Sequence, residues 1–130
     1  MGILGNAKPI MIICVRDQDQ AAAFYRDTLG LSQTGKDRFA AIFDVAGVPL
    51  RVSTVADFTP HEHTVLDFNV RDLRGVALAL REKGVAFNFY RGFGQDELGI
   101  LAVPGTSMSV AWFKDPDGNV LSVMEDRAKP

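Results

Sequence analysis

One structural unit is written twice in this sequence, and the repeat constrains the fold more than any other feature. The tripeptide Val15-Arg16-Asp17 recurs as Val70-Arg71-Asp72, at an offset of 55 residues. A later pattern, Asp44…Gly47…Leu50-Arg51-Val52, recurs at an offset of 71 as Asp115…Gly118…Leu121-Ser122-Val123. A small sheet with one helix leaves one face bare, so neither half is expected to fold well alone. The sequence therefore predicts an internal duplication.

The first half predicts a strand, a helix and three further strands. Asp17 follows the apolar residues 9–15 and stands where a helix cap belongs, and Gly30 is placed to end that helix. The later strands are predicted over residues 31–34, 39–45 and 48–55, with a tight turn at Ala46-Gly47 between the last two.

The second half repeats this order after a linker at Phe58-Thr59-Pro60. Asp72 caps a helix that reaches about residue 83 and ends at Gly84. The longer second offset is explained by an insertion at residues 91–98, which carry few strand signals. Strands are predicted over residues 64–70, 86–90, 99–103, 108–113 and 120–124.

Residues 111–123, AWFKDPDGNVLSV, predict a hairpin, because Pro116 fixes φ and Gly118 accepts a positive φ. Together with residues 9–31, PIMIICVRDQDQAAAFYRDTLGL, this stretch resembles the glyoxalase/bleomycin-resistance/extradiol-dioxygenase group, the vicinal oxygen chelate superfamily. The resemblance runs from about Pro9 to Met124. It implies an α+β fold in which two tandem βαβββ modules form a curved mixed sheet around a cavity. We expect one domain over residues 1–130, with modules at about 8–57 and 62–126.

The resemblance also implies where a metal would be held. In metal-bearing members, four ligands come from equivalent first and last strands, and these positions map to Ile10, Arg51, Val65 and Ser122. None is a normal ligand for a divalent ion, because Ile and Val have no donor atom and arginine carries a fixed positive charge. We therefore expect no metal and no cofactor, and none of the metal-dependent lactoylglutathione lyase, extradiol cleavage or fosfomycin-type reactions.

His61 and His63, the only histidines, keep one alternative open. They share a face with Val65 if the strand extends back to them, so a register error of two residues would bring His63 near a ligand position. A metal-dependent lyase or dioxygenase is therefore the alternative function. The simpler interpretation is two solvated histidines at the entrance of a strand.

Alternation along the strands predicts the lining of the cavity. The opposite parity is uniformly apolar and should face the helices (Met11, Ile13, Leu66, Phe68, Val70, Leu121 and Val123). Trp112, with Tyr90, Phe93 and Phe113, supplies candidate stacking surfaces for a planar ligand, and the simpler interpretation places these aromatic residues in the core. The predicted lining is Ile10, Ile12, Cys14, Arg51, Ser53, Val65, Asp67, Asn69, Val120, Ser122 and Met124, and with Trp112 these residues, Val120 excepted, are the predicted ligand-binding set.

An apolar cavity with a few polar groups is typical of a small-molecule site. We expect Arg51 and Asp67 to pair across it when it is empty, since a buried unpaired charge is costly. The leading hypothesis is a metal-free protein that binds a small, partly apolar organic molecule without chemistry. Two further functions stay open: a metal-free catalyst with Asp67 as base, and an interaction module with a filled cavity.

The charge and the composition limit the kinds of partner and the location that we expect for this chain. A net charge of −2 and scattered basic residues give no basic stripe for nucleic acid. The apolar run near the N-terminus is too short for a signal peptide or a membrane span, so neither is expected. The single cysteine, Cys14, agrees with a reducing compartment, and a cytoplasmic location is expected. The resemblance implies a homodimer, and the sequence leaves open whether the halves pair within one chain or between two.

Overall fold

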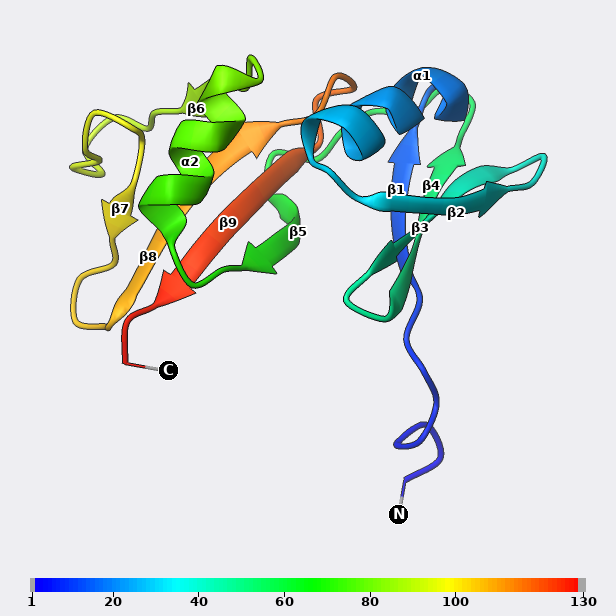
Figure 1. Cartoon of the computed structure of the whole chain (residues 1–130), viewed down its shortest axis with the longest axis horizontal. Coiled ribbons are helices and arrows are strands. Elements are labelled where there is room, and N and C mark those ends of the chain that lie inside the picture. The colour runs from blue at the N-terminus through cyan, green and yellow to red at the C-terminus, as the bar shows by residue number, and fades with distance from the viewer. Residues whose placement is uncertain (1, 129–130) are drawn as a thin grey trace. The chain divides into compact units, whose positions relative to one another are not determined.

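In the computed structural model, which describes residues 2–128, the chain divides into two compact units, residues 1–58 and 59–130 (Figure 1). Each unit contains a mixed β-sheet and a helical segment. The predicted α+β class is therefore confirmed.

The first unit is a four-stranded sheet in the order β1-β4-β3-β2. β1 pairs with β4 in parallel, and the other neighbours are antiparallel. A short α-helix continues directly into a π-helical turn, and it is packed against β3 and β4. The elements are β1 (Met11–Val15), α1 (Gln18–Ala23), η1 (Phe24–Thr28), β2 (Ser32–Lys36), β3 (Ala40–Val45) and β4 (Val48–Thr54).

The second unit has the equivalent order, β5-β9-β8-β6, with β7 also paired to β8. β5 runs parallel to β9, as β1 does to β4, and the remaining pairs are antiparallel. The elements are β5 (Thr64–Asn69), α2 (Leu73–Glu82), β6 (Phe87–Asn88), β7 (Leu101–Ala102), β8 (Met108–Lys114) and β9 (Val120–Asp126). The strands predicted at 86–90 and 99–103 are thus only two residues long, and the chain between them forms a loop.

Both predicted helix caps are present. The Asp17 carboxylate accepts hydrogen bonds from the backbone N–H groups of Asp19 and Gln20, and Asp72 accepts one of 3.1 Å from Gly75. These bonds satisfy amide donors that a helix start leaves unpaired. Gly84 follows α2 with a φ of 95°, which glycine adopts without steric cost.

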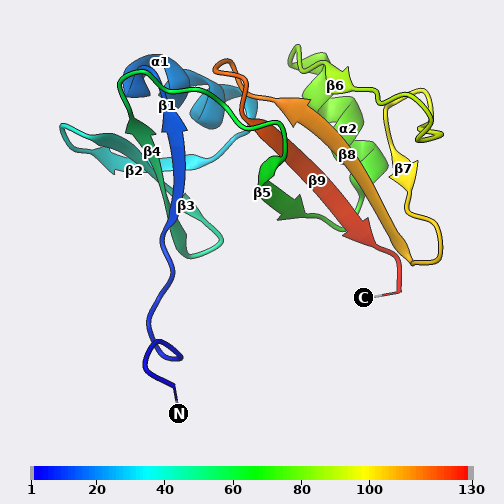
Figure 2. The ribbon, with the colours of Figure 1, turned by 180° about the vertical axis from the view of Figure 1, so that it is seen from behind.

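The two faces of the first sheet differ as the alternation predicts. Ile13 and Val52 are buried, whereas Ile12 is 62% exposed. In the second unit β5 alternates between half-buried and exposed residues, but β9 is buried on both faces, at Val120 and Ser122 as well as at Leu121 and Val123. α2 lies in front of β8 and β9 in Figure 1 and behind them in Figure 2, so it covers one face of that sheet. The apolar parity therefore builds the core of each unit.

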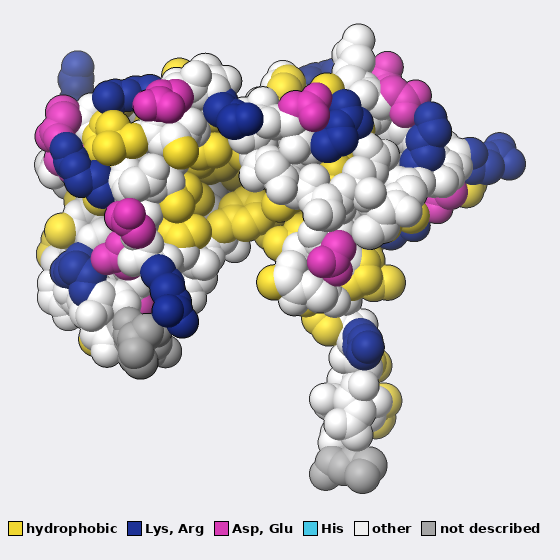
Figure 3. Space-filling view, in the orientation of Figure 1, with side chains coloured by type: hydrophobic (Ala, Val, Ile, Leu, Met, Phe, Trp, Pro, Cys, Tyr) yellow, Lys and Arg dark blue, Asp and Glu magenta, His cyan; other side chains and the backbone are white. Residues whose placement is uncertain are grey.

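Over residues 2–128, no helix combines the length and the apolar character needed to cross a membrane. On the face shown in Figure 3, Lys and Arg side chains are interspersed with Asp and Glu side chains on both units.

Candidate functional site

The first unit brings most of its predicted lining residues together. Ile12 lies opposite Arg51, and Cys14 lies opposite Ser53, in the parallel β1–β4 pair. Ile10 precedes β1 and is 57% exposed. These side chains therefore share the sheet face that does not contain Ile13.

In the second unit a row of side chains crosses three strands. Trp112 of β8 is in register with Ser122 of β9, and Ser122 is in register with Asp67 of β5. The Ser122 hydroxyl is buried and donates a hydrogen bond of 2.7 Å to Asp67 Oδ1. Asn69 and Met124 form the next pair along the same face.

Val65 departs from the simple alternation. Thr64 is opposite Val120, but Leu66 is already opposite Leu121, so Val65 is the extra residue of a β-bulge. A bulged residue is left out of the strand register. Val65 therefore has no partner in the β5–β9 pairing, and its predicted equivalence with Ile10 does not follow from strand register.

Arg51 and Asp67, which the sequence predicted to pair with each other, each have a polar partner within their own unit. Arg51 Nη2 lies 2.8 Å from Asp37 Oδ2, while Asp67 accepts the bond from Ser122. The pKa of Asp37 is lowered from its ordinary value, first by the hydrogen bond from Arg51 and then by the backbone N–H of Phe39. The sequence prediction overlooked Asp37, which lies in the turn before β3.

Three aromatic side chains gather on the second unit. Trp112 meets Tyr90 with ring centroids 5.4 Å apart and Phe93 at 5.8 Å, and Tyr90 meets Phe93 at 5.4 Å. We call these three residues the aromatic cluster. Phe113 is fully buried and packs its ring against Phe87, so it belongs to the core, the simpler of its two interpretations, and offers no surface to a ligand.

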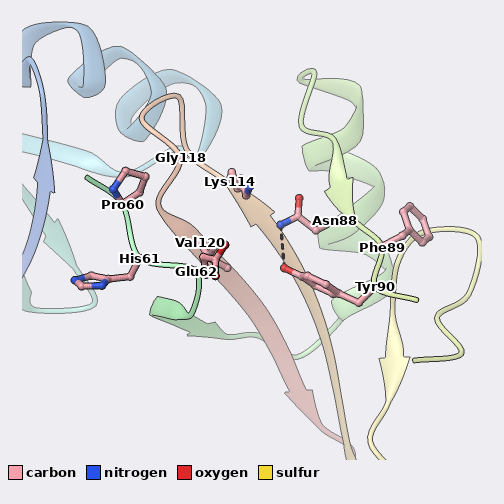
Figure 4. A pocket seen from close by; sticks show the side chains of 9 residues that line it. All are labelled: Pro60, His61, Glu62, Asn88, Phe89, Tyr90, Lys114, Gly118 and Val120. Atoms are coloured by element: carbon pink, nitrogen blue, oxygen red, sulfur yellow. Dashed lines mark hydrogen bonds between the residues drawn. The ribbon is translucent and has the colours of Figure 1, made fainter. Parts of the chain in front are cut away.

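The aromatic cluster lines a pocket of about 180 Å³ together with Glu62, His63, Thr64 and Val120. A larger pocket of about 710 Å³ shares Glu62, Tyr90 and Val120 with it (Figure 4). Tyr90 extends its ring toward Glu62 and Val120, whereas Phe89 points to the other side. The remaining lining of the larger pocket is Pro60, His61, Asn88, Phe89, Lys114 and Gly118.

Gln95 holds the loop that carries Tyr90 and Phe93. Its Oε1 accepts a 2.7 Å hydrogen bond from the Tyr90 backbone N–H. Its Nε2 donates to the carbonyl oxygens of Asn88 and Gly99 at 2.9 and 2.7 Å. The Asn88 side chain in turn donates to the Tyr90 hydroxyl at 3.1 Å (Figure 4). One glutamine therefore ties both ends of the loop together.

Of the predicted ligand-binding set, Trp112 lines the smaller of these two pockets. Val120, predicted to face the cavity, lines both pockets, and Tyr90 and Phe93, two of the candidate stacking surfaces, line the smaller one. Glu62 and Lys114 were missed as lining residues. The signal for Lys114 was present, because it stands two residues after Trp112 on the same strand and so shares its face.

The donor set does not fit a divalent metal ion. His61 and His63 lie before β5, are exposed, and stack on each other with ring centroids 4.9 Å apart. Arg51 is ion-paired, and Ser122 donates to Asp67. Within residues 2–128, no three His, Cys, Asp or Glu side chains are grouped so that they could hold an ion.

Residues 8–123 match the model of the Glyoxalase/Bleomycin resistance protein/Dioxygenase superfamily. Solved structures with the same fold include a glyoxalase family protein from Enterococcus faecalis, with a TM-score of 0.74, 16% identity, and 95% of this chain and 100% of that chain covered. A lactoylglutathione lyase from Agrobacterium tumefaciens has a TM-score of 0.70 and 17% identity, with 93% of this chain and 95% of that chain covered. The fosfomycin resistance protein FosX from Listeria monocytogenes has a TM-score of 0.71 and 10% identity, with 92% of this chain and 93% of that chain covered. No curated protein matches the sequence.

Proposed function

Because this chain belongs to the Glyoxalase/Bleomycin resistance protein/Dioxygenase superfamily, we propose that it is a metal-free binding protein for a small, partly apolar organic molecule. The family resemblance noted in residues 9–31 and 111–123 is confirmed by this membership. The solved structures, at 10% to 17% identity, support the fold alone.

The observation that carries the proposal is the pocket of the aromatic cluster. Tyr90 and Phe93 are 36% and 47% exposed, although each also packs against Trp112. Exposed aromatic surface beside convergent polar groups is the usual composition of a small-molecule site. The polar groups here are Glu62, His63 and Thr64.

The residue types at the metal positions argue against the alternative of a metal-dependent lyase or dioxygenase. Ile10 and Val65 have no donor atom, and Arg51 repels a cation. A binding site that uses no metal is compatible with the residues at these positions. The proposed site lies on the second unit and needs only the described side chains of that unit.

Trp112 makes this proposal directly testable, because it is the only tryptophan in the chain. We expect a panel of planar probes, such as naphthalene and indole derivatives, to change Trp112 emission saturably and to raise the melting temperature. Tyr90→Ala and Phe93→Ala should each weaken binding several-fold. Phe39→Ala is the matched control, because Phe39 is exposed but belongs to the first unit. A panel that produces no saturable change overturns the proposal.

We further propose that the binder is a cytoplasmic homodimer. Ile10 and Ile12 of the first unit are 57% and 62% exposed, and burying such side chains is favourable. Sedimentation analysis should give twice the monomer mass, and Ile12→Lys should shift the distribution to monomer. A wild-type monomer at high protein concentration contradicts this part of the proposal.

A further inference from the structure

The pocket of about 180 Å³ combines three aromatic rings with a single carboxylate. Glu62 is exposed, and within residues 2–128 it forms no ion pair or hydrogen bond. No Lys or Arg is among the described residues that line this pocket. The pocket therefore places one negative charge beside three aromatic rings.

Aromatic rings attract cations through their quadrupole, and tryptophan is the strongest of the three ring types. A carboxylate beside the rings adds Coulomb attraction for the same sign of charge. We propose that the ligand of this site carries a compact organic cation, such as a quaternary ammonium group, which rests on the aromatic cluster with Glu62 as its counter-charge. This inference rests on the proposed binding function and names the class of ligand.

A negatively charged ligand is less well matched by the two pockets. Lys114 is the one lysine or arginine among the described lining residues of the larger pocket, and it does not line the smaller one. An anion that reached Lys114 would still share the larger pocket with Glu62, which lines both. Charge complementarity at the aromatic cluster therefore favours a cationic head group.

The test compares choline with 3,3-dimethylbutan-1-ol, which has the same shape without the charge. Both are titrated against Trp112 emission at the same pH and ionic strength. Choline should bind saturably and about 2- to 30-fold more tightly than the alcohol, the range that a cation–π contact provides. Glu62→Gln should bring this ratio of affinities closer to one, and Lys114→Gln, the matched control, should not.

Three outcomes overturn the inference: an alcohol that binds as tightly as choline, a ratio unchanged in Glu62→Gln, or no saturable response to choline. The neutral planar probes separate this failure from a failure of the binding function. If those probes bind and choline does not, only the cationic ligand class is wrong. If neither class binds, both proposals fall.

Discussion

The Ser122 hydroxyl donates to Asp67 Oδ1 across the parallel β9–β5 pair, at 2.7 Å. The equivalent positions of the first unit, by the repeat offsets and by strand register, are Arg51 and Ile12. Ile12 cannot accept a hydrogen bond, and Arg51 pairs with Asp37 instead. Equivalent positions in the two units thus form different polar interactions: a hydrogen bond between neighbouring strands in the second unit and an ion pair with Asp37 in the first.

Removing this hydroxyl should destabilise the second unit. Ser122 is 3% exposed, so Ser122→Ala loses the hydrogen bond without opening the site to water, at a cost of about 1 kcal/mol in unfolding free energy. Asp67→Asn retains an acceptor oxygen and should cost less. Urea unfolding measures both. Equal stability of Ser122→Ala and wild type would show that the bond contributes nothing net.

The Asp37–Arg51 pair predicts a pH effect. The pKa of Asp37 lies below its ordinary value of 3.8, chiefly because Arg51 donates to it. A carboxyl with a lowered pKa in the folded state stabilises the protein at higher pH, and this contribution disappears as pH falls through the folded-state pKa. In Arg51→Gln the pKa should rise toward 3.8 but stay below it, since the N–H groups of Phe39 and Ala40 still donate. Carbon-13 NMR titration of Asp37 tests this, and an unchanged pKa would contradict it.

Gly118 and Gly47 form a matched pair for a substitution test. Both have positive φ, 93° and 87°, so alanine at either position costs about 1–2 kcal/mol of backbone strain. A Cβ at Gly118 would also lie 3.1 Å from Pro60 Cγ, whereas one at Gly47 meets nothing within 4 Å. Gly118→Ala should therefore lower the melting temperature more than Gly47→Ala. Equal losses would mean that Pro60 moves aside freely.

Gln95→Ala should impair binding more than folding. The change leaves the Tyr90 N–H and the carbonyl groups of Asn88 and Gly99 without their side-chain partner. We expect a red shift of Trp112 emission and several-fold weaker binding of the planar probes, because the loop no longer holds Tyr90 in place. The control is Gln33→Ala, which alters another side-chain amide in the first unit. Wild-type affinity in Gln95→Ala would refute this positioning role.

Local signals in the sequence predicted the features that depend on a few neighbouring residues. Asp17 and Asp72 were predictable as helix caps because a short side chain with an acceptor oxygen, placed just before a helical pattern, can accept hydrogen bonds from the first N–H groups of the helix. Gly118 occupies its turn because the turn needs a positive φ. Ile12 and Ile13 face opposite sides because a strand alternates.

Features set by pairing between distant segments were not predictable in the same way. The bulge at Val65 depends on how β5 meets β9, which no property of residues 64–69 specifies. Asp37 stands 14 residues before Arg51, and nothing periodic connects them. Gln95 lies in a loop with little local pattern, and its role exists only once residues 88 and 99 have come together.

The closure of that loop by Gln95 has an evolutionary consequence. The bonds to Asn88 and Gly99 fix the two ends, so the segment between them can change length or sequence while the sheet keeps its pairing. Tyr90 and Phe93 both lie within it, and Trp112 remains on β8. As long as Gln95 is kept, the rest of the segment from residue 89 to residue 98 can therefore be exchanged, so that a duplicated scaffold acquires new ligand preferences in one half without a change in the other.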